Sequence, residues 1–548
     1  MTGIDYVIVF LFLALTFYVG SIFYRWVGSS DDFFVAGRQL TPFILAAVLT
    51  ATNVNLYSFI GQAGVAYQHG ISILWQTWTG NMALVFSGLF VLPILRRLRI
   101  KTIPEFLELR FSRGVRTFVA VLWVVRLSFW LGVISYTASV AAQPITGLHS
   151  FTTWILIFSL IAMVYSAIGG MWSVAFTDVM QFAFMLAGAL MVLPLAMSAL
   201  GWWPGLSANL PDAALQLVPQ SGLYNWKFIL AIFLLGIEWA CVDQGLLQRA
   251  FAADNTKTVA RGLVLAGIIT TPFALLWNIP GLASRVLNPG LANPDMAVPT
   301  LLAGLLPPVV LGFVVCGLIS SHLSTIAANL NGVATIFTSD IYKNVLKRQA
   351  SDRDALRVAR LMTLAAGLLM ILFAYLVPHM GGAVNAYLTI IAIMDMPLFI
   401  IAIVYGLLWR RTNWQGAIGG YIAGAVAGIV GTFVYPLGFN STTFLSAGVT
   451  LLGTAIITLL TRAPSAQKIA TIWNAKQPGH EEIAAQNSYH IIPTTRSGKA
   501  ALTLFGAGWM VFIAGVLLGA WNHPAASLIA VAGMILYFLG GLGRAFTD

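Results

Sequence analysis

Runs of about twenty apolar residues constrain the fold of this chain more than any other feature. About fifteen runs follow one another, over residues 4–27, 42–67, 70–98, 116–142, 151–170, 172–200, 224–247, 259–287, 299–340, 354–377, 382–409, 412–436, 443–461, 499–519 and 523–543. Each is long enough to cross a hydrocarbon core about 30 Å thick. Only 9% of the residues are charged, too few to cover a soluble domain. We therefore expect an all-α polytopic membrane protein with about 14–15 transmembrane helices.

The positive charges predict the orientation of these helices. Apart from Arg126, Lys227 and Arg285, the Lys and Arg residues fall in loops on one side of the expected membrane or at the helix ends beside them. The positive-inside rule makes that side cytoplasmic, which places the N-terminus outside and the chain in the cell inner (plasma) membrane. The first run lacks a small-residue cleavage site and is expected to be retained. The net charge of +11 is thus explained without a nucleic-acid partner.

A stripe of small and polar residues runs along the segment 317–342. Its members are Gly317, Ser321, Ser324, Ala328, Asn331, Thr335 and Thr338, which share one face of a helix. Unpaired polar groups are costly in hydrocarbon, so this face is expected to meet other helices or a watery cavity. The stripe indicates a protein that moves an ion and a solute across the membrane.

A second polar cluster interrupts the run 42–67. Asn53 and Asn55 at mid-membrane disfavour a regular helix and favour a discontinuous one, whose unwound carbonyls can bind a cation. A polar helix-packing seam is the alternative. Sodium prefers oxygen ligands, which these carbonyls and the hydroxyls of Ser320 and Ser321 could supply. No phosphate loop, clustered metal-ligand pattern or nucleophile motif is found, and Cys241 and Cys316 suggest neither a disulfide nor a metal site, so an enzyme is not expected.

Five charged residues fall within the expected spans: Arg126, Asp178, Glu238, Asp243 and Asp395. Charges inside a membrane are costly and indicate functional sites or internal pairs. Asp178 and Asp243 lie near cytoplasmic helix ends, where a cap or an Arg partner explains them. Glu238 and Asp395 are expected either to line a solute cavity or to pair with Arg126, which itself is expected to be a structural counter-charge.

Seven segments together resemble the sodium/solute symporter family that includes the sodium/glucose cotransporters. They are DFFVAGR (32–38), ATNVN (51–55), IPEFLELRF (103–111), GGMWSVAFTDVMQ (169–181), DQGLLQRAFAADN (243–255), SSHLSTIAANLNGVATIFTSDIY (320–342) and YGLLWRR (405–411). The resemblance implies a LeuT-type core of two inverted five-helix repeats at 42–200 and 224–411. Residues 1–41 would add a helix and a linker, and 412–548 accessory helices with a loosely ordered cytoplasmic loop at 461–500.

The resemblance also implies an ion site. Matched by motif, the sodium ligands are Ala51, Val54, Gly317, Ser320 and Ser321, with carbonyls from the first three and hydroxyls from the two serines. Asp178 matches an aspartate implicated in sodium coupling, with Ser324 as partner in a second ion site.

The solute half of the site matches the sugar carriers poorly. Asn53 matches a sugar-contacting asparagine and Trp239 stands where relatives place a gating tyrosine, but the glutamate, lysine and glutamine of the sugar site have no counterparts. The expected solute contacts are Asn53, Asn55, Ser58, Gln76, Thr77, Glu238, Trp239 and Asp395. These residues predict a sodium-coupled secondary active symporter that imports a small polar solute, with a sugar or polyol favoured, by alternating access. A cationic or zwitterionic amine or amino acid is the alternative solute; a solute sensor and a channel are the other classes.

Overall fold

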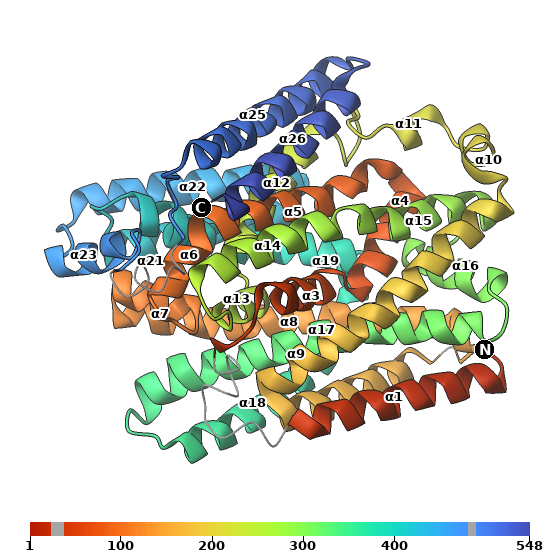
Figure 1. Ribbon diagram of the computed structural model, residues 1–548, viewed down its shortest axis with the longest axis horizontal. Helices are drawn as coiled ribbons and strands as arrows, with labels where there is room; N and C mark the ends of the chain where they lie inside the picture. The colour runs from red at the N-terminus through yellow and green to blue at the C-terminus, as the bar shows by residue number, and fades with distance from the viewer. Residues whose placement is uncertain (24–37, 149, 480–488, 548) are drawn as a thin grey trace.

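The computed structural model describes residues 1–23, 38–148, 150–479 and 489–547, so most of the DFFVAGR motif lies outside it. The chain forms a bundle of helices that run mainly along its long axis (Figure 1). Among the described residues, eleven helices are long and apolar enough to cross a membrane, or up to thirteen if each bent pair is one span. Two shorter apolar helices, Gly3–Val19 and Phe151–Val164, coincide with two further spans of the 14–15 expected from the sequence.

The two halves of the core are joined by α10 (Trp202–Ala208) and α11 (Asp212–Leu215). Helix α1 (Gly3–Phe23) precedes the core. The first half contains α3 (Pro42–Asn53), α4 (Ala63–His69), α5 (Leu74–Phe86), α6 (Leu92–Arg97), α7 (Ile103–Arg110), α8 (Arg113–Thr146) and α9 (Phe151–Ala199). The second half contains α12 (Trp226–Val242), α13 (Gln244–Phe251), α14 (Thr256–Thr270), α15 (Leu275–Leu287), α16 (Ala297–Leu305), α17 (Val310–Ile336), α18 (Asp352–Ala374), α19 (Ala383–Ile390) and α20 (Met396–Phe399). The last helices are α21 (Trp414–Ile429), α22 (Gly438–Leu460), α23 (Ala466–Asn474), α25 (Arg496–Leu518) and α26 (Ala526–Phe546).

Several helices continue through wider π-helical turns. These are η3 (Ser58–Gln62), η5 (Ser87–Val91), η8 (Phe337–Leu346), η10 (Ile391–Asp395), η11 (Ile400–Leu408) and η12 (Val430–Val434). Such turns occur often at functional sites. Two of them, η3 and η10, lie next to the polar cavity described below.

The first helix of each half is broken. Helix α3 and the segment Ser58–His69 meet at a bend of 50°, and α12 meets α13 at a bend of 46°. The sequence predicts the first break from its asparagines. Interrupted helices at corresponding positions of two inverted repeats are typical of the binding site in such transporters.

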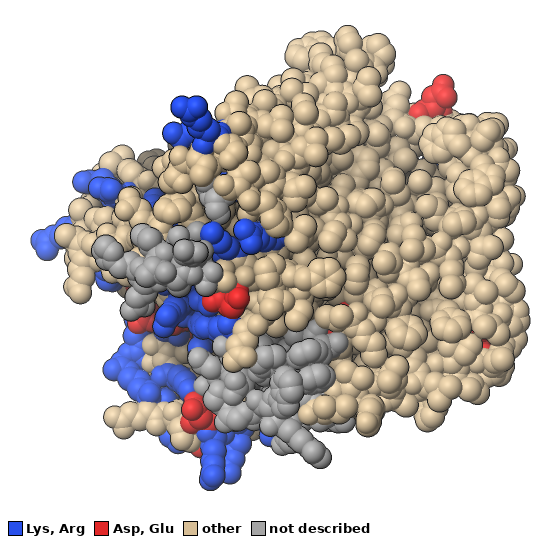
Figure 2. Space-filling model, in the orientation of Figure 1, with Lys and Arg blue, Asp and Glu red and all other residues tan. Residues whose placement is uncertain are grey.

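Lys and Arg gather at one end of the molecule. In Figure 2 they lie on the left, over the end where Figure 1 labels α7 and α23, while the opposite end is almost free of them in this view. This arrangement agrees with the sidedness expected from the sequence. It supports, as a proposal, that the left end is cytoplasmic.

Helix α17 is held at both of its ends. At its N-terminal end, Oδ1 of Asp5 in α1 accepts hydrogen bonds from the backbone N–H groups of Val309 (2.8 Å) and Gly312 (3.1 Å). This carboxylate caps α17 just where Val309 adopts a φ of 73°, which is strained for a β-branched residue. Helix α1 therefore supports the second half of the core, although it lies outside both repeats.

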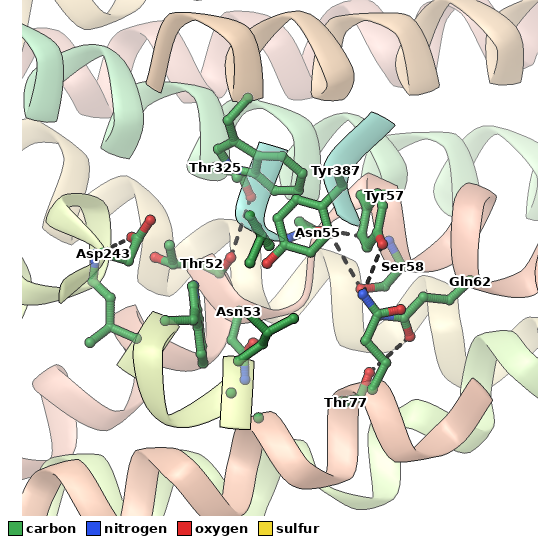
Figure 3. A pocket seen from close by; sticks show the side chains of 18 of the residues that line it. Thr52, Asn53, Asn55, Tyr57, Ser58, Gln62, Thr77, Asp243, Thr325 and Tyr387 are labelled. Atoms are coloured by element: carbon green, nitrogen blue, oxygen red, sulfur yellow. Dashed lines mark hydrogen bonds between the residues drawn. The ribbon is translucent and has the colours of Figure 1, made fainter. Parts of the chain in front are cut away.

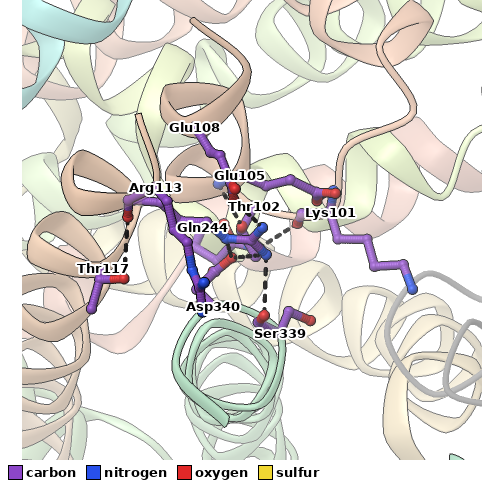
Figure 4. A network of polar contacts seen from close by, with 10 residues as sticks. Lys101, Thr102, Glu105, Glu108, Arg113, Thr117, Gln244, Ser339 and Asp340 are labelled. Atoms are coloured by element: carbon purple, nitrogen blue, oxygen red, sulfur yellow. Dashed lines mark hydrogen bonds and ion pairs between the residues drawn. The ribbon is translucent and has the colours of Figure 1, made fainter. Parts of the chain in front are cut away.

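Where α17 continues into η8, Arg116 of α8 links α7, α8 and η8. Figure 4 shows its partners Glu108, Ser339 and Asp340. The guanidinium donates hydrogen bonds to Oδ1 of Asp340 in η8 (2.7 Å), to Oε2 of Glu108 in α7 (2.6 Å) and to the carbonyl of Ser339 (3.1 Å). Asp340 is fully buried, so the guanidinium neutralises a charge that could not be left alone.

The region 461–500 is more ordered than the sequence indicates, although 480–488 lie outside the described residues. Helix α23 packs on α7, where the Trp473 ring lies 5.8 Å from the guanidinium of Arg110 and 4.3 Å from Nζ of Lys476. Lys476 also donates a hydrogen bond to the carbonyl of Leu407, at the end of η11 (2.7 Å). The sequence of this segment, with its low hydrophobicity, does not predict these cation–π and capping contacts. They attach the segment to α7 and to the end of η11.

Candidate ion and solute site

The break after α3 exposes backbone carbonyls in the middle of the bundle. Helix α3 ends at Asn53, Val54 is extended (φ −85°, ψ 100°), and the next helical segment starts where the Asn55 side chain accepts a hydrogen bond from the N–H of Ser58 (3.2 Å). The carbonyls of the last turn of α3 thus lack the partners that a continuous helix would provide. The carbonyl of Thr52 in this turn, and that of Val54 just after it, face α17.

Helix α17 presents hydroxyl groups to this break. Oγ of Ser321 donates a hydrogen bond to the carbonyl of Val54 (3.3 Å), and Oγ1 of Thr325 donates to that of Thr52 (3.4 Å). Ser320 instead donates to the carbonyl of Cys316 in its own helix (2.7 Å). The structure therefore brings together two of the five expected sodium ligands directly, Val54 and Ser321.

The other expected ligands are buried near this contact. Ala51 lies in the last turn of α3, and Gly317 lies one turn before Ser321. A Cβ atom on Gly317 would stand 3.0 Å from the carbonyl of Phe184 in α9, so glycine permits this close approach of two helices. The donor set of carbonyl and hydroxyl oxygens suits a hard cation such as sodium. In the part of the chain that is described, no cluster of three or more His, Cys, Asp or Glu residues could hold a metal ion.

Asp178 has a different partner from the one that the second ion site requires. Its Oδ2 forms an ion pair with the guanidinium of Arg249 in α13 (2.7 Å), and both side chains are fully buried. Ser324 lies beside this carboxylate, but neither its hydroxyl nor Oδ1 of Asp178 completes a hydrogen bond. In this conformation Arg249 supplies the positive charge that a second sodium would bring.

A polar cavity of about 90 Å³ adjoins the break (Figure 3). Six of the eight expected solute contacts line it, namely Asn53, Asn55, Ser58, Gln76, Thr77 and Trp239. The remaining polar or aromatic walls are Thr52, Tyr57, Gln62, Trp130, Asp243, Thr325, Asn329 and Tyr387. Broken helix α3–α4, α5, α12 and α17 all contribute, so the cavity lies between the two halves of the core.

Hydrogen bonds within the wall leave two fully buried amide oxygens without a partner. Gln76 donates to the hydroxyl of Tyr57 (2.8 Å), and Asn329 donates to the carbonyl of Thr325 (2.9 Å). Oε1 of Gln76 and Oδ1 of Asn329 are buried without a hydrogen-bond partner. Buried acceptors normally have partners, so these two oxygens indicate a ligand that donates hydrogen bonds.

The acidic residues correct one expectation. Neither Glu238 nor Asp395 lines the cavity. Asp395 receives two hydrogen bonds of 2.9 Å from Nε of Arg126, and Glu238 is fully buried without a hydrogen bond. Asp243 does reach the cavity wall, but its Oδ2 is 3.3 Å from NH1 of Arg126 and its Oδ1 caps α13 by accepting from the N–H of Leu246 (3.1 Å). The guanidinium of Arg126 therefore occupies Asp395 and Asp243, while Glu238 does not line the cavity.

Several residues of this wall are not predicted from the sequence. Asn329 lies one position from Ala328 of the polar stripe, and a small shift of the stripe would have included it. Gln62 follows Ser58 at helical spacing; its Oε1 accepts hydrogen bonds from Thr77 (2.8 Å) and Trp277 (3.0 Å). Tyr387 carries no local signal, since only the fold brings its ring to 5.1 Å from that of Tyr57.

Comparisons with known proteins identify the family of this chain. A family model described as "Sodium:solute symporter family" matches residues 33–424. A sodium/glucose cotransporter of Vibrio parahaemolyticus is 31% identical over 429 residues, which cover 72% of this chain and 78% of the relative. The sodium/myo-inositol cotransporter 2 of Sus scrofa is 28% identical over 447 residues, 74% of this chain and 66% of the relative.

Solved structures extend the likeness to the fold. A Na⁺-coupled sialic acid symporter, in a substrate-bound outward-open state, superposes with a TM-score of 0.77 at 21% identity, covering 85% of this chain and 99% of the other. A nucleobase-cation-symport-1 family transporter in a closed conformation gives 0.53 at 16% identity, covering 80% and 97%. At these identities the likeness concerns the fold alone, which is the all-helical LeuT type.

Proposed function

Because this chain belongs to the sodium:solute symporter family, it is a sodium-coupled solute symporter and not an enzyme, and we propose that its solute is a neutral polyhydroxylated compound of the sugar or polyol class. The observation that carries this proposal is the pair of free amide oxygens, from Gln76 and Asn329, in the wall of the central cavity. Hydroxyl groups of a sugar or polyol would donate to them. The names of the relatives, which carry glucose and myo-inositol, support the same class.

The charges of the site argue against the amine alternative. The carboxylate in the cavity wall, that of Asp243, is already shared between Arg126 and the N-terminus of α13. A cationic solute would have to displace Arg126 from a buried site, which leaves an uncompensated charge and costs several kcal/mol. A neutral solute leaves this arrangement intact.

Sodium would act where the break of α3 meets α17. The cation would take the place of the hydrogen bond between Ser321 and the carbonyl of Val54, with the hydroxyl turned so that its oxygen faces the ion. The carbonyls of Ala51 and Gly317 and the hydroxyl of Ser320 would complete the site. It would bind best in the state in which the two helices are closest, and this difference in affinity is what shifts the population of states. Each sodium ion also gains about 2.3 kcal/mol per 100 mV as it enters down the membrane potential.

We propose that the two halves, 42–200 and 224–411, rock against each other around this site. The solute would bind between the broken helix α3–α4 and helices α5, α12 and α17. It would enter from the side of α4 and leave toward the Lys- and Arg-rich end. Import by alternating access follows from this arrangement and from the inward gradient of sodium.

Uptake into proteoliposomes tests the proposal. With sodium outside and potassium inside, radiolabelled D-glucose or myo-inositol is expected to accumulate above its external concentration. Replacement of external sodium by potassium should abolish this accumulation. Accumulation of a quaternary amine such as choline, with no uptake of either polyhydroxylated probe, would contradict the proposed solute class. Uptake that is unaffected by sodium would contradict the ion coupling.

A further inference from the structure

A second cavity, lined mainly by apolar side chains, lies behind the helices that form the candidate ion site. Its volume is about 170 Å³. Its walls come from α1, α8, α9 and α17, and from Leu56 just after the break in α3. In Figure 1 these four helices lie in the lower half of the molecule, with α1 along the edge. Among the described residues, this apolar cavity shares no lining side chain with the polar cavity of Figure 3.

The ring of His322 brings polar atoms without partners into the apolar cavity. The side chain is fully buried, and neither Nδ1 nor Nε2 forms a hydrogen bond with any residue that the structure describes. Two other polar groups of the lining are already paired. The hydroxyl of Thr146 donates to the carbonyl of Ala142 (2.6 Å), and the indole N–H of Trp154 donates to that of Leu148 (2.9 Å). Buried polar groups normally have partners, so the His322 nitrogens indicate a ligand that supplies one.

The imidazole defines the polar group of that ligand. A charge buried among apolar side chains without a counter-ion is costly, so His322 is neutral here. A neutral imidazole offers one N–H donor and one acceptor nitrogen. A single hydroxyl group can pair with either of them. A ligand with several polar groups would leave the others without partners, because the rest of the lining is apolar or already paired.

The remainder of the cavity suits one aromatic ring. The rings of Trp154 and Phe158 stack at 5.6 Å between centroids, and Phe158 meets the His322 ring at 5.1 Å and 67°. Aromatic rings attract one another at such distances. An apolar cavity of about 150 Å³ stays dry and binds benzene, so the volume here holds one ring with a small substituent. A lipid acyl chain is longer than this cavity and carries no group that pairs with an imidazole.

The apolar cavity reaches the surface that faces lipid. Tyr6 of α1 and Ile157 of α9 line it and are 47% and 39% exposed. Both lie in apolar helices, Gly3–Val19 and Phe151–Val164, whose exposed sides meet hydrocarbon in a membrane. A neutral molecule with an apolar body, dissolved in the bilayer, can therefore enter between these two helices.

We propose that this cavity binds a neutral phenol-like molecule from the bilayer, one aromatic ring with a single hydroxyl group that pairs with His322. The site does not depend on the proposed solute class, because it lies beside the polar cavity and shares no described wall residue with it. Its occupant would contact Leu56, which follows Asn55 at the break. It would also contact His322, which follows Ser321 in α17, and so it would lie against both sides of the candidate ion site.

Fluorine NMR titration of the purified full-length protein in detergent tests this site with two probes of the same size. 4-Fluorophenol is expected to bind saturably, with one molecule per chain. 4-Fluorotoluene, which has a methyl group in place of the hydroxyl, should bind about tenfold more weakly when both concentrations are referred to the detergent phase. Absence of saturable 4-fluorophenol binding would refute the site. Equal affinities for the two probes would refute the proposed ligand class.

A variant of the imidazole locates the bound probe. His322→Phe keeps a ring and removes both nitrogens, so the affinity for 4-fluorophenol should fall about tenfold, to that for 4-fluorotoluene, which should change by less than about twofold. His379→Phe, at an exposed histidine in η9 (Val377–Met380), is the matched control and should keep the preference for 4-fluorophenol. An undiminished preference in His322→Phe would place the probe elsewhere and refute the site.

Filling the cavity gives a second measurement. Ala141→Phe adds a ring from the α8 wall and should abolish the saturable binding of both probes. If this variant does not fold, His322→Phe still decides the outcome. Saturating D-glucose or myo-inositol should leave 4-fluorophenol in place in wild type. Displacement of 4-fluorophenol by either compound would put the probe in the polar cavity and refute a separate site.

Discussion

Helix α17 and the broken helix α3–α4 meet at the candidate sodium site, but they are built in opposite ways. Helix α17 is continuous and buried, with Asp5 at its N-terminal end and Arg116 beside η8, into which it continues. Helix α3 stops at Asn53, and the chain bends by 50° before it continues. A cation bound between them, as proposed above, would join a fixed helix to the break. Such an ion would favour one position of the broken helix without any change in α17.

The attachment of α17 through Arg116 and Asp340 should contribute most to thermal stability. Arg116→Met leaves the fully buried Asp340 without its cation, and the loss of one partner of a buried pair costs about 3–5 kcal/mol. We expect the largest fall in thermal stability of the variants considered, measured by unfolding of the purified protein. The double variant with Asp340→Asn should recover part of it. Arg353→Met, at an exposed position of α18, is the control. If its thermal stability falls as far as that of Arg116→Met, the contact between Arg116 and Asp340 does not fix α17.

The contact between α17 and the break after α3 should control the affinity for sodium. Ser321→Ala removes the hydroxyl that meets the carbonyl of Val54, and a ligand to a charged group contributes about 1.5–3 kcal/mol. The sodium concentration for half-maximal uptake should rise about tenfold or more, with little change in stability. Ser128→Ala, where a buried hydroxyl bonds only to its own helix, should leave it unchanged. Equal sodium dependence in the two variants would remove Ser321 from the ion site.

The affinity for the solute should depend on the cavity wall and not on the contact between Ser321 and Val54. Gln76→Leu removes an amide oxygen that has no partner in the protein, and the lost hydrogen bond to a solute hydroxyl should raise the KM about tenfold. Uptake measured at saturating sodium gives this value, and the half-maximal sodium concentration should stay within about twofold. Gln143→Leu, whose amide donates only to Ser139 in its own helix, is the control. An unchanged KM in Gln76→Leu would exclude this oxygen from the solute site.

The attachment of α17 through Asp5 should have the smallest effect on the half-maximal sodium concentration. Asp5→Asn keeps an oxygen that can accept from Val309 and Gly312 but removes the charge at the helix N-terminus, which contributes about 0.3–1 kcal/mol. The half-maximal sodium concentration should therefore change by less than about fivefold in the same uptake assay. A change as large as that of Ser321→Ala would show that the charge of α1, and not only its packing, sets the ion site.

The sequence predicted the elements of this contrast better than their partners. Asn53 and Asn55 indicated the break, and the stripe that starts at Gly317 indicated a helix facing inward, because both signals are local. The fold class and the family are confirmed. The roles of Ser321 and Val54 stay predictions, although the structure places the two residues in contact.

Pairings over long distances could not be ranked from the sequence. Arg126 had Glu238 and Asp395 as candidate partners, and only the packing of α8 against the turn η10 shows that Asp395 takes it. The link between Asp178 and Arg249 depends in the same way on how α9 and α13 meet. Asn329 and Tyr387 were missed because a side chain enters a cavity through the arrangement of several helices, which no local pattern contains.

Helix α23 has a practical consequence for the choice of protein fragments. Cutting the chain after Arg411 would seem to keep both repeats and remove only accessory helices. It would also remove Trp473 and Lys476, which lie against Arg110 of α7 and the last turn of η11. A shortened protein would therefore lose the contacts by which this segment joins α7 to the end of η11. Fragments intended for structure determination or for fusion should keep residues 466–476, whatever they omit beyond them.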